Sequence, residues 1–311
     1  MSLIEQAAKR LEELRRAGIR VPDENGGDLG TPKSRNVTSP LTASARKYTS
    51  LAGSKTNNVE ARPYRAETQE RFDLDLARLA AQGFVTPDMP RSRIGDEFRV
   101  IKRPLLENTS DKRPHPVRNG NLIMVTSAVP GDGKTFTAVN LAMSIATEVN
   151  KTVLLVDADV ARPSFSKVLS LPDEKCGLLD VLDDGSIQLP DVLVRTNIEN
   201  LSILPSGTPH AQATELLASE AMSRLLSELA ARYSDRILIF DSPPLLVTTE
   251  SRVLAAQMGQ VVFVVQAEST LQSDVKRALA TIEACPIKLM VLNQARTVAQ
   301  GAYGYGYGYG A

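Results

Sequence analysis

Five short runs of aliphatic and β-branched residues place the strongest constraint on how this chain can fold. They are LIMVTS, TVLLVD, ILIFDS, VVFVVQ and IKLMVLN, at residues 122–127, 152–157, 237–242, 261–266 and 287–293. Nearly continuous apolar runs are typical of strands that are covered on both faces. Between them, TFTAVNLAMSIATEV, ATELLASEAMSRLLSELAARY and STLQSDVKRALATIEA have the period of a helix. The pattern predicts an α/β fold in which helices flank both faces of a mostly parallel sheet.

The segment SAVPGDGKT, residues 127–135, follows the first predicted strand and precedes a predicted helix. Its glycines let the backbone wrap around phosphate, while the helix amino terminus directs N–H groups at the anion. Lys134 would reach the β- and γ-phosphates, and Thr135 would offer its hydroxyl to magnesium. Ala128 stands where the strict phosphate-loop pattern has glycine, but the strand–turn–helix context is kept. We expect ATP to contact the loop residues Val129, Pro130, Gly131, Asp132, Gly133, Lys134, Thr135 and Phe136.

Carboxylates follow two other predicted strands. Asp157 ends the second strand, Asp159 lies two residues further on, and Asp241 lies near the end of the third strand. Taken singly, each could cap a helix or sit in a turn, but a buried carboxylate needs a positive partner. We predict Mg²⁺ bound to ATP as this partner, held directly or through water. The expected metal ligands are Thr135, Asp159 and Asp241.

The overall composition narrows the class of partner. Lys plus Arg and Asp plus Glu number 36 each, so no global basic field indicates nucleic acid. The two cysteines, Cys176 and Cys285, indicate a reducing compartment rather than a disulfide scaffold. No run approaches the roughly 20 apolar residues of a membrane span, and the start does not resemble a signal peptide. We therefore expect a cytoplasmic protein.

Four blocks are expected along the chain. Ser2 and Glu5 form a predicted capping box for an amphipathic helix at residues 1–18. This helix could dock on a partner, on a second subunit or on its own domain. Residues 19–71 are rich in Gly, Ser, Thr, Asn and Pro and are predicted to be a flexible linker. The compact domain is expected at 72–293 and a flexible tail at 294–311.

The tail contains four of the seven tyrosines of the chain, each followed by glycine. A core cannot bury rings at this position, and the glycines leave each hydroxyl on a mobile backbone. The residues alone allow either a sticky, disordered segment or a set of accessible hydroxyl groups. The four residues are Tyr303, Tyr305, Tyr307 and Tyr309.

These features together resemble the bacterial tyrosine kinases. The resemblance rests on SAVPGDGKT, LLVDADVARP, ILIFDSPP, LPSGTPHAQATELLAS and the terminal tyrosines. Within that family the chain is similar to the soluble autokinases of exopolysaccharide loci, including those associated with exosortases. The resemblance implies a P-loop NTPase-like kinase domain that phosphorylates the tail tyrosines between subunits. It also implies that Asp157 accepts or orients the acceptor proton and that Asn293 contacts adenine.

The resemblance also implies a homo-oligomer. The oligomerisation motif of the family aligns with Asp96, Arg99 and Lys102 in a predicted helix at 91–106, with lysine in place of its last arginine. A looser ring would follow from this change. The second acidic motif has Ala161 where the family usually has arginine, and Arg162 one place later.

Other ATPases share the expected fold. Switch ATPases of the partition and division-site type carry a signature lysine early in the loop, where this chain has Val129. A switch ATPase without tyrosine kinase activity is the alternative function, and it has no need of terminal tyrosines.

The family resemblance further implies regulation of exopolysaccharide synthesis or export. The expected partners are a membrane polysaccharide chain-length regulator as activator and a tyrosine phosphatase. Through the regulator, the kinase would associate peripherally with the inner membrane.

Overall fold

The computed structural model describes residues 71–89, 92–110, 116–172, 176–232 and 236–296. The predicted N-terminal helix, nearly all of the predicted linker and the tail tyrosines lie outside these residues. No helix in the described part is long and apolar enough to cross a membrane.

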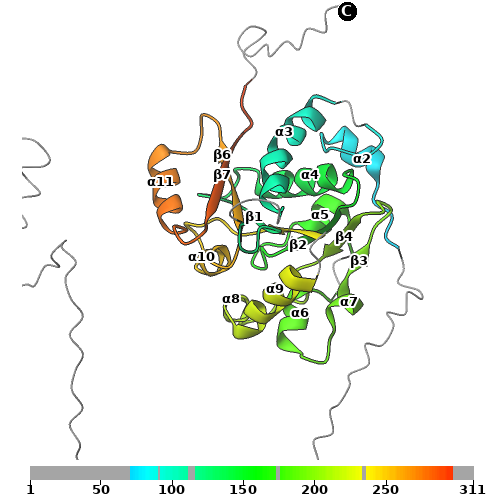
Figure 1. Cartoon of the computed structure of the whole chain (residues 1–311), viewed down its shortest axis with the longest axis vertical. Helices are drawn as coiled ribbons and strands as arrows, with labels where there is room; N and C mark the ends of the chain where they lie inside the picture. The colour runs from blue at the N-terminus through cyan, green and yellow to red at the C-terminus, as the bar shows by residue number, and fades with distance from the viewer. Residues whose placement is uncertain (1–70, 90–91, 111–115, 173–175, 233–235, 297–311) are drawn as a thin grey trace, which may run out of the picture. The chain divides into compact units, whose positions relative to one another are not determined.

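A single seven-stranded sheet forms the centre of the described domain (Figure 1). The strand order is β3-β4-β2-β5-β1-β6-β7, and every neighbouring pair is parallel except β3 with β4. The strands are β1 (Leu122–Ser127), β2 (Thr152–Asp157), β3 (Val194–Arg195), β4 (Leu201–Leu204), β5 (Arg236–Asp241), β6 (Gln260–Gln266) and β7 (Ile287–Asn293). The predicted α/β class with a mostly parallel sheet is confirmed.

Helices cover both faces of this sheet. One face packs against α2 (Leu76–Ala81), α3 (Arg93–Asn108), α4 (Lys134–Ala146) and α5 (Phe165–Leu169). The other packs against α6 (Leu178–Asp183), α7 (Leu189–Val192), α8 (Ala213–Leu217), α9 (Glu220–Arg232), α10 (Glu250–Ala255) and α11 (Gln272–Ala280). Successive side chains of β1 enter opposite cores, since Ile123 belongs to the first and Met124 to the second. This explains why the strand sequences lack polar alternation.

The structure contains elements that the sequence analysis did not predict, among them strands β3 and β4 and the short helices α2, α5, α6, α7 and α10. Strands β3 and β4 were not predicted, because runs of two and four residues give too little pattern to identify. The predicted helix at 213–233 is two helices, and the break lies at Ala218 and Ser219. The amide of Ala218 closes α8, and Ser219 Oγ accepts from the backbone N–H of Met222 at the start of α9.

Helix α3 contains the predicted oligomerisation motif. Asp96 and Arg99 form an ion pair on its exposed side. Lys102, in contrast, is only 4% exposed, and its Nζ lies 2.6 Å from Glu148 Oε1 and donates to Ser144 O at 2.5 Å. Lys102 is therefore committed to contacts with the end of α4 in its own subunit. Its place in the oligomerisation motif, with Asp96 and Arg99, stays a prediction.

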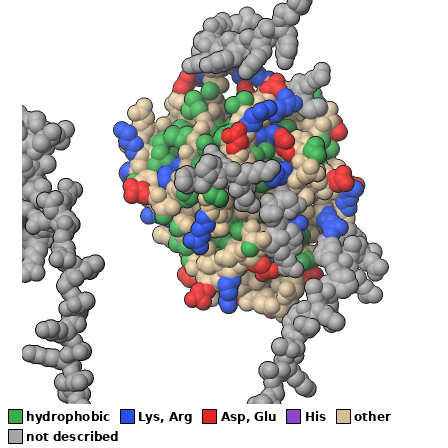
Figure 2. Space-filling view, in the orientation of Figure 1, with side chains coloured by type: hydrophobic (Ala, Val, Ile, Leu, Met, Phe, Trp, Pro, Cys, Tyr) green, Lys and Arg blue, Asp and Glu red, His purple; other side chains and the backbone are tan. Residues whose placement is uncertain are grey.

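Charged side chains on the face shown in Figure 2 are of both signs and lie interspersed. Lys and Arg do not gather there into one broad basic surface.

Candidate active site

The phosphate loop joins β1 to α4, as the sequence predicts. Strand β1 ends at Ser127, and α4 begins at Lys134 directly after Gly133. Gly131 and Gly133 both have a φ of +94°, in the left-handed region that favours glycine. A Cβ atom on Gly133 would also lie 2.0 Å from Nδ2 of Asn293. The positive φ therefore favours glycine at position 133, and a larger residue there would also displace the Asn293 amide.

Two side chains from later in the chain hold this loop. Asn293 Nδ2 donates to Asp132 O at 2.8 Å, and Thr270 Oγ1 donates to Asp132 Oδ1 at 2.7 Å. Asp132 is 1% exposed, so these bonds take the place of water. Asn293 lies where the sequence predicts, and its contact with adenine stays a prediction. Thr270 was missed, although a hydroxyl shortly after the end of β6 could have indicated it.

The predicted magnesium ligands Thr135 and Asp241 meet directly. Thr135 Oγ1 donates to Asp241 Oδ2 at 2.6 Å. Ser164 Oγ lies 3.0 Å from Thr135 Oγ1 and donates to Asp241 Oδ2 at 3.4 Å. The first residues of α4 and the end of β5 are thus joined at the loop. Ser164 was not predicted, because nothing local marks a serine seven residues after β2 as part of the site.

Asp157 lies beside Asp241, because the two residues are register partners in the parallel strands β2 and β5. Its Oδ2 accepts from the backbone N–H groups of Ser164 and Phe165 at 3.2 and 3.3 Å. Asp157 is 1% exposed. Burial, with the nearby charge of Asp241, raises the pKa of Asp157 well above its usual value. Two carboxylates so close cannot both ionise cheaply without a cation.

Asp159 is half-buried just beyond the end of β2. Burial raises the pKa of its carboxyl group, although the charges of Lys134 and Arg162 lower it. Arg162, which stands one place later than the usual arginine of the second acidic motif, therefore acts electrostatically on Asp159. The charges of the three predicted carboxylates and of Lys134 therefore influence one another's pKa values.

Unpaired buried oxygens test whether magnesium and nucleotide phosphates suit this site. In the described part of the chain, four buried side-chain atoms lack a hydrogen-bond partner. Three are carboxylate oxygens around the loop, and the atoms are Asp132 Oδ2, Asp157 Oδ1, Asp241 Oδ1 and Arg78 Nε. Oxygens of this kind are the ligands that Mg²⁺ prefers.

The described residues contain no group of three His, Cys, Asp or Glu side chains that could hold a metal by themselves. Mg²⁺ at nucleotide sites typically takes only one or two carboxylates and completes its shell with phosphate and water. The residues present therefore fit a magnesium–nucleotide complex better than a resident metal.

Asp241→Asn is expected to stabilise the protein in the absence of Mg²⁺ and nucleotide. Burial raises the pKa of Asp241 from 3.8 to about 7, so the folded state binds this proton more tightly than the unfolded state. The wild-type free energy of unfolding should therefore fall as pH rises from about 4 to about 7, by at most on the order of 4 kcal/mol from this group. The asparagine variant should lose less over that range.

Urea unfolding at pH 5 and pH 8, without metal, measures this effect. Asp88→Asn, a change at an exposed carboxylate, is the control and should behave as wild type. An equal loss of stability in wild type and Asp241→Asn would contradict the raised pKa.

Known proteins are similar to the part of the chain that contains the phosphate loop and the three carboxylates. Residues 120–293 match the family model of an AAA domain. The tyrosine-protein kinase YwqD of Bacillus subtilis is 31% identical over 217 residues, which are 69% of this chain and 87% of that protein.

Two solved structures are similar to this chain over most of its length. The chimerical protein CapA2B2 has a TM-score of 0.56 at 28% identity, over 71% of this chain and 93% of that one. The kinase domain of the Escherichia coli tyrosine kinase ETK has a TM-score of 0.58 over 78% of this chain and 89% of that one. Its 24% identity supports the fold alone. With its AAA domain and its similarity to YwqD, the chain belongs to the family of bacterial tyrosine-protein kinases.

Proposed function

We propose that this protein is an ATP-dependent tyrosine autokinase that phosphorylates the tail tyrosines of a neighbouring subunit. The observation that carries the proposal is the junction of Thr135, Asp157 and Asp241 at the phosphate loop, with unpaired carboxylate oxygens beside it. The acceptors would be Tyr303, Tyr305, Tyr307 and Tyr309.

Each residue has a separate role in the proposed transfer. The loop amides and Lys134 bind the phosphates, and Thr135, Asp159 and Asp241 would hold Mg²⁺. Bound Mg²⁺ would neutralise charge on the β- and γ-phosphates. The acceptor tyrosine oxygen forms a bond to the γ-phosphorus while the bond to the leaving ADP oxygen breaks. The phenolic proton passes to Oδ1 of Asp157, which has no partner in the described protein.

The environment of Asp157 supports its role as the base. A free tyrosine hydroxyl has a pKa of about 10 and is a poor nucleophile at neutral pH. The raised pKa of Asp157 makes it a stronger proton acceptor than an exposed aspartate. The backbone N–H groups at its Oδ2 fix the orientation of the carboxylate.

The proposal includes assembly and regulation. Asp96 and Arg99 lie on the exposed side of α3, and together with Lys102 they stay the proposed oligomerisation motif. The bounds 1–18, 19–71, 72–293 and 294–311 stay the proposed blocks of helix, linker, kinase domain and tail. We place this kinase in exopolysaccharide synthesis or export, activated by a membrane chain-length regulator and reversed by a tyrosine phosphatase. Peripheral association with the inner membrane would follow from the regulator.

Incubation with γ-³²P-ATP and Mg²⁺, with and without residues 303–310, tests the proposal. The full chain should become labelled on tyrosine, and the shortened chain should lose nearly all of the label. Tyr64→Phe changes a tyrosine outside the tail and serves as a matched control that should label normally. ATP hydrolysis without labelled tyrosine would favour the switch ATPase, and full labelling of the shortened chain would refute the tail as acceptor.

A further inference from the structure

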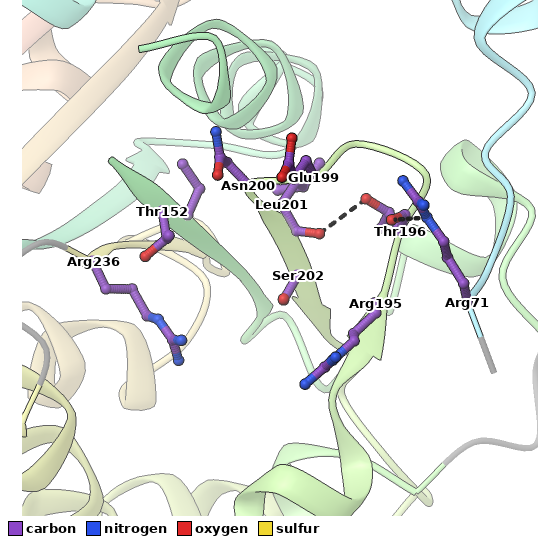
Figure 3. Close-up of a pocket in the computed structure, with 10 residues that line it drawn as sticks. Arg71, Thr152, Arg195, Thr196, Glu199, Asn200, Leu201, Ser202 and Arg236 are labelled. Carbon is purple, nitrogen blue, oxygen red and sulfur yellow. Dashed lines mark hydrogen bonds between the residues drawn. The ribbon is translucent and has the colours of Figure 1, made fainter. Parts of the chain in front are cut away.

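The two edges of the sheet differ in how they are covered. Strand β3 forms one edge, and the chain before α2 runs beside it. The N–H of Phe72 donates to Arg195 O at 2.8 Å, and the N–H of Asn197 donates to Phe72 O at 3.2 Å. Figure 3 shows Arg71 of the same segment, whose Nε donates to Thr196 O at 2.8 Å, beside a pocket of about 460 Å³. A segment of the chain therefore covers this edge.

Strand β7 forms the opposite edge, and within the described residues no strand pairs with its outer side. Asn293 O accepts from the N–H of Ala267, the residue after β6, at 2.9 Å. The backbone groups of successive residues point to opposite sides of a strand. Those of Lys288, Met290 and Leu292 therefore point away from β6, where a further strand could bind them.

The exposed face of β7 is apolar. Met290 is 57% exposed and Leu292 is 64% exposed. Leu289 and Val291 point to the other face and pack against the core that α3 and α4 cover. Figure 2 shows hydrophobic side chains gathered over β7, beside α11. The strand thus presents both an open backbone edge and two apolar side chains on one face.

The usual devices that protect an edge strand are weak in β7. Such strands are commonly protected by charges, proline or a bulge. The strand contains no proline, and its pairing with β6 is regular from Ile287 to Asn293. Its one charged residue, Lys288, donates through Nζ to Cys285 O at 2.6 Å, so the ammonium group is directed at the preceding turn. These features favour a further segment that covers β7.

We propose that the tail of the same chain pairs with β7 as an antiparallel eighth strand. The four tail tyrosines stand at every second position, with glycine between them. In an extended chain, side chains at alternate positions lie on one face. All four rings would therefore lie on one face, with the same spacing as the exposed side chains of β7.

One register satisfies both the side chains and the backbone. Opposite residues of an antiparallel pair have their side chains on the same face. With Tyr303 opposite Leu292 and Tyr305 opposite Met290, the rings cover the two exposed apolar side chains. The outward backbone groups of β7 then form hydrogen-bonded pairs with the tyrosines. Glycine lowers strand propensity, so the pairing is expected to be weak and reversible.

Chain connection favours the tail of the same subunit over that of another copy. Strand β7 ends at Asn293, and residues 294–302 separate it from Tyr303. These nine residues could extend about 30 Å, whereas neighbouring strands lie only about 5 Å apart. The chain can therefore reverse, and closing such a loop costs little more entropy than closing a shorter one. Covalent linkage also keeps the effective concentration of the tail high.

The inference rests on the proposed autokinase function only for the effect of phosphorylation. Each phosphate would add about −1.5 to −2 charge at neutral pH. Neighbouring rings on one face of a strand are only about 7 Å apart, so the phosphates would repel one another. We expect phosphorylation to release the tail from β7.

Hydrogen exchange of single backbone amides, followed by NMR, tests the pairing without ATP. The full-length, dephosphorylated protein is compared with protein that lacks residues 303–310. The amides of Met290 and Leu292 should exchange several-fold more slowly in the full chain, because a paired amide exchanges only when the pair opens. The amide of Val291 points toward β6 in both proteins and is the internal control. Since no phosphoryl transfer takes place, failure here is distinct from failure of the labelling experiment.

Variants in the tail show whether the rings hold it on β7. Tyr303→Ser with Tyr305→Ser should remove the slower exchange, because serine cannot cover the apolar side chains. Tyr303→Phe with Tyr305→Phe keeps the rings and should keep the slower exchange.

Variants in β7 test the other side of the contact. Met290→Glu with Leu292→Glu changes two exposed side chains and should remove the slower exchange, measured at the amide of Lys288. Val149→Glu changes an exposed apolar residue that lies after α4 and is 82% exposed. This control should leave the exchange of the Lys288 amide as in wild type.

A disulfide distinguishes the tail of the same chain from that of another copy. Cys176→Ser removes the exposed native cysteine, and Leu292→Cys with Tyr303→Cys is added to it. Mild oxidation should give a bond within one chain, seen as a monomer on a non-reducing gel.

Three outcomes would overturn the proposal. They are equal exchange in the full and shortened chains, slow exchange that persists in the serine variant, and a disulfide that forms only between two chains. The last result would assign the edge of β7 to the tail of another copy.

Discussion

Lys134→Met is expected to lower the rate of tail phosphorylation by at least about 10²–10³-fold, the usual cost of removing one preorganised charge-stabilising group. Lys134 is the first residue of α4 and is largely buried. Its charge lowers the pKa of both Asp159 and Asp241, so it already acts at the place where phosphate charge would develop. Methionine keeps the length and apolar character of the stem but removes this charge.

Transfer of radioactive phosphate to the tail measures this loss, and binding of a fluorescent ATP analogue measures its cause. We expect weaker binding together with a much larger fall in rate. Lys134→Arg, which keeps the charge but changes its shape, should recover part of the rate. A methionine variant with the wild-type rate would show that the loop does not act in phosphoryl transfer.

Asp157→Asn is expected to reduce the rate by about 10²–10⁴-fold, as general-base removal does, and to leave ADP binding within a few-fold of wild type. Asparagine retains an oxygen that can accept from the N–H groups of Ser164 and Phe165. The local structure should therefore survive while the proton acceptor is lost. Isothermal titration with Mg²⁺ and ADP, beside single-turnover phosphorylation, separates the two effects.

The pH profile distinguishes a base from a structural residue. Because burial and Asp241 raise the pKa of Asp157, the wild-type rate should rise with pH as this carboxyl group loses its proton. The residual rate of Asp157→Asn should lack that rise. Asp184→Asn changes an exposed carboxylate and should keep both the wild-type rate and the wild-type profile. A normal rate in Asp157→Asn would transfer the role of base to the half-buried Asp159.

Local pattern was enough to predict the sheet class and the phosphate loop. A few neighbouring residues are enough in each case: the apolar run LLV before Asp157 predicts a buried strand, and the glycines before Lys134 predict a phosphate loop. The meeting of Asp157 with Asp241 also followed, because parallel strands place their carboxyl ends at one edge of the sheet. In the structure, Asp157 and Asp241 are register partners in β2 and β5.

Other features could not be predicted because they depend on residues far apart in the chain. A lysine in an amphipathic helix is normally exposed. Lys102 is buried because Ser144 of α4 and Glu148, two residues after the end of α4, contact its ammonium group. The hydrogen bond from Thr270 to Asp132 likewise joins residues that are 138 positions apart in the sequence. Strand β4 joins the sheet through its pairing with β2 rather than through any strong strand pattern of its own.

The division between the two kinds of feature has one physical origin. Hydrophobic periodicity and turn chemistry are local properties, so they determine the helices, most of the strands and the loop that faces phosphate. The order of the strands is set by how the crossovers pack on the two faces of the sheet. That order brings Asn293 to the loop and Arg71, Arg195 and Arg236 to one pocket. The chemistry at the carboxyl edge of the sheet could therefore be predicted from short motifs. The pocket at the amino edge, lined by Arg71, Arg195 and Arg236, forms only when the domain folds.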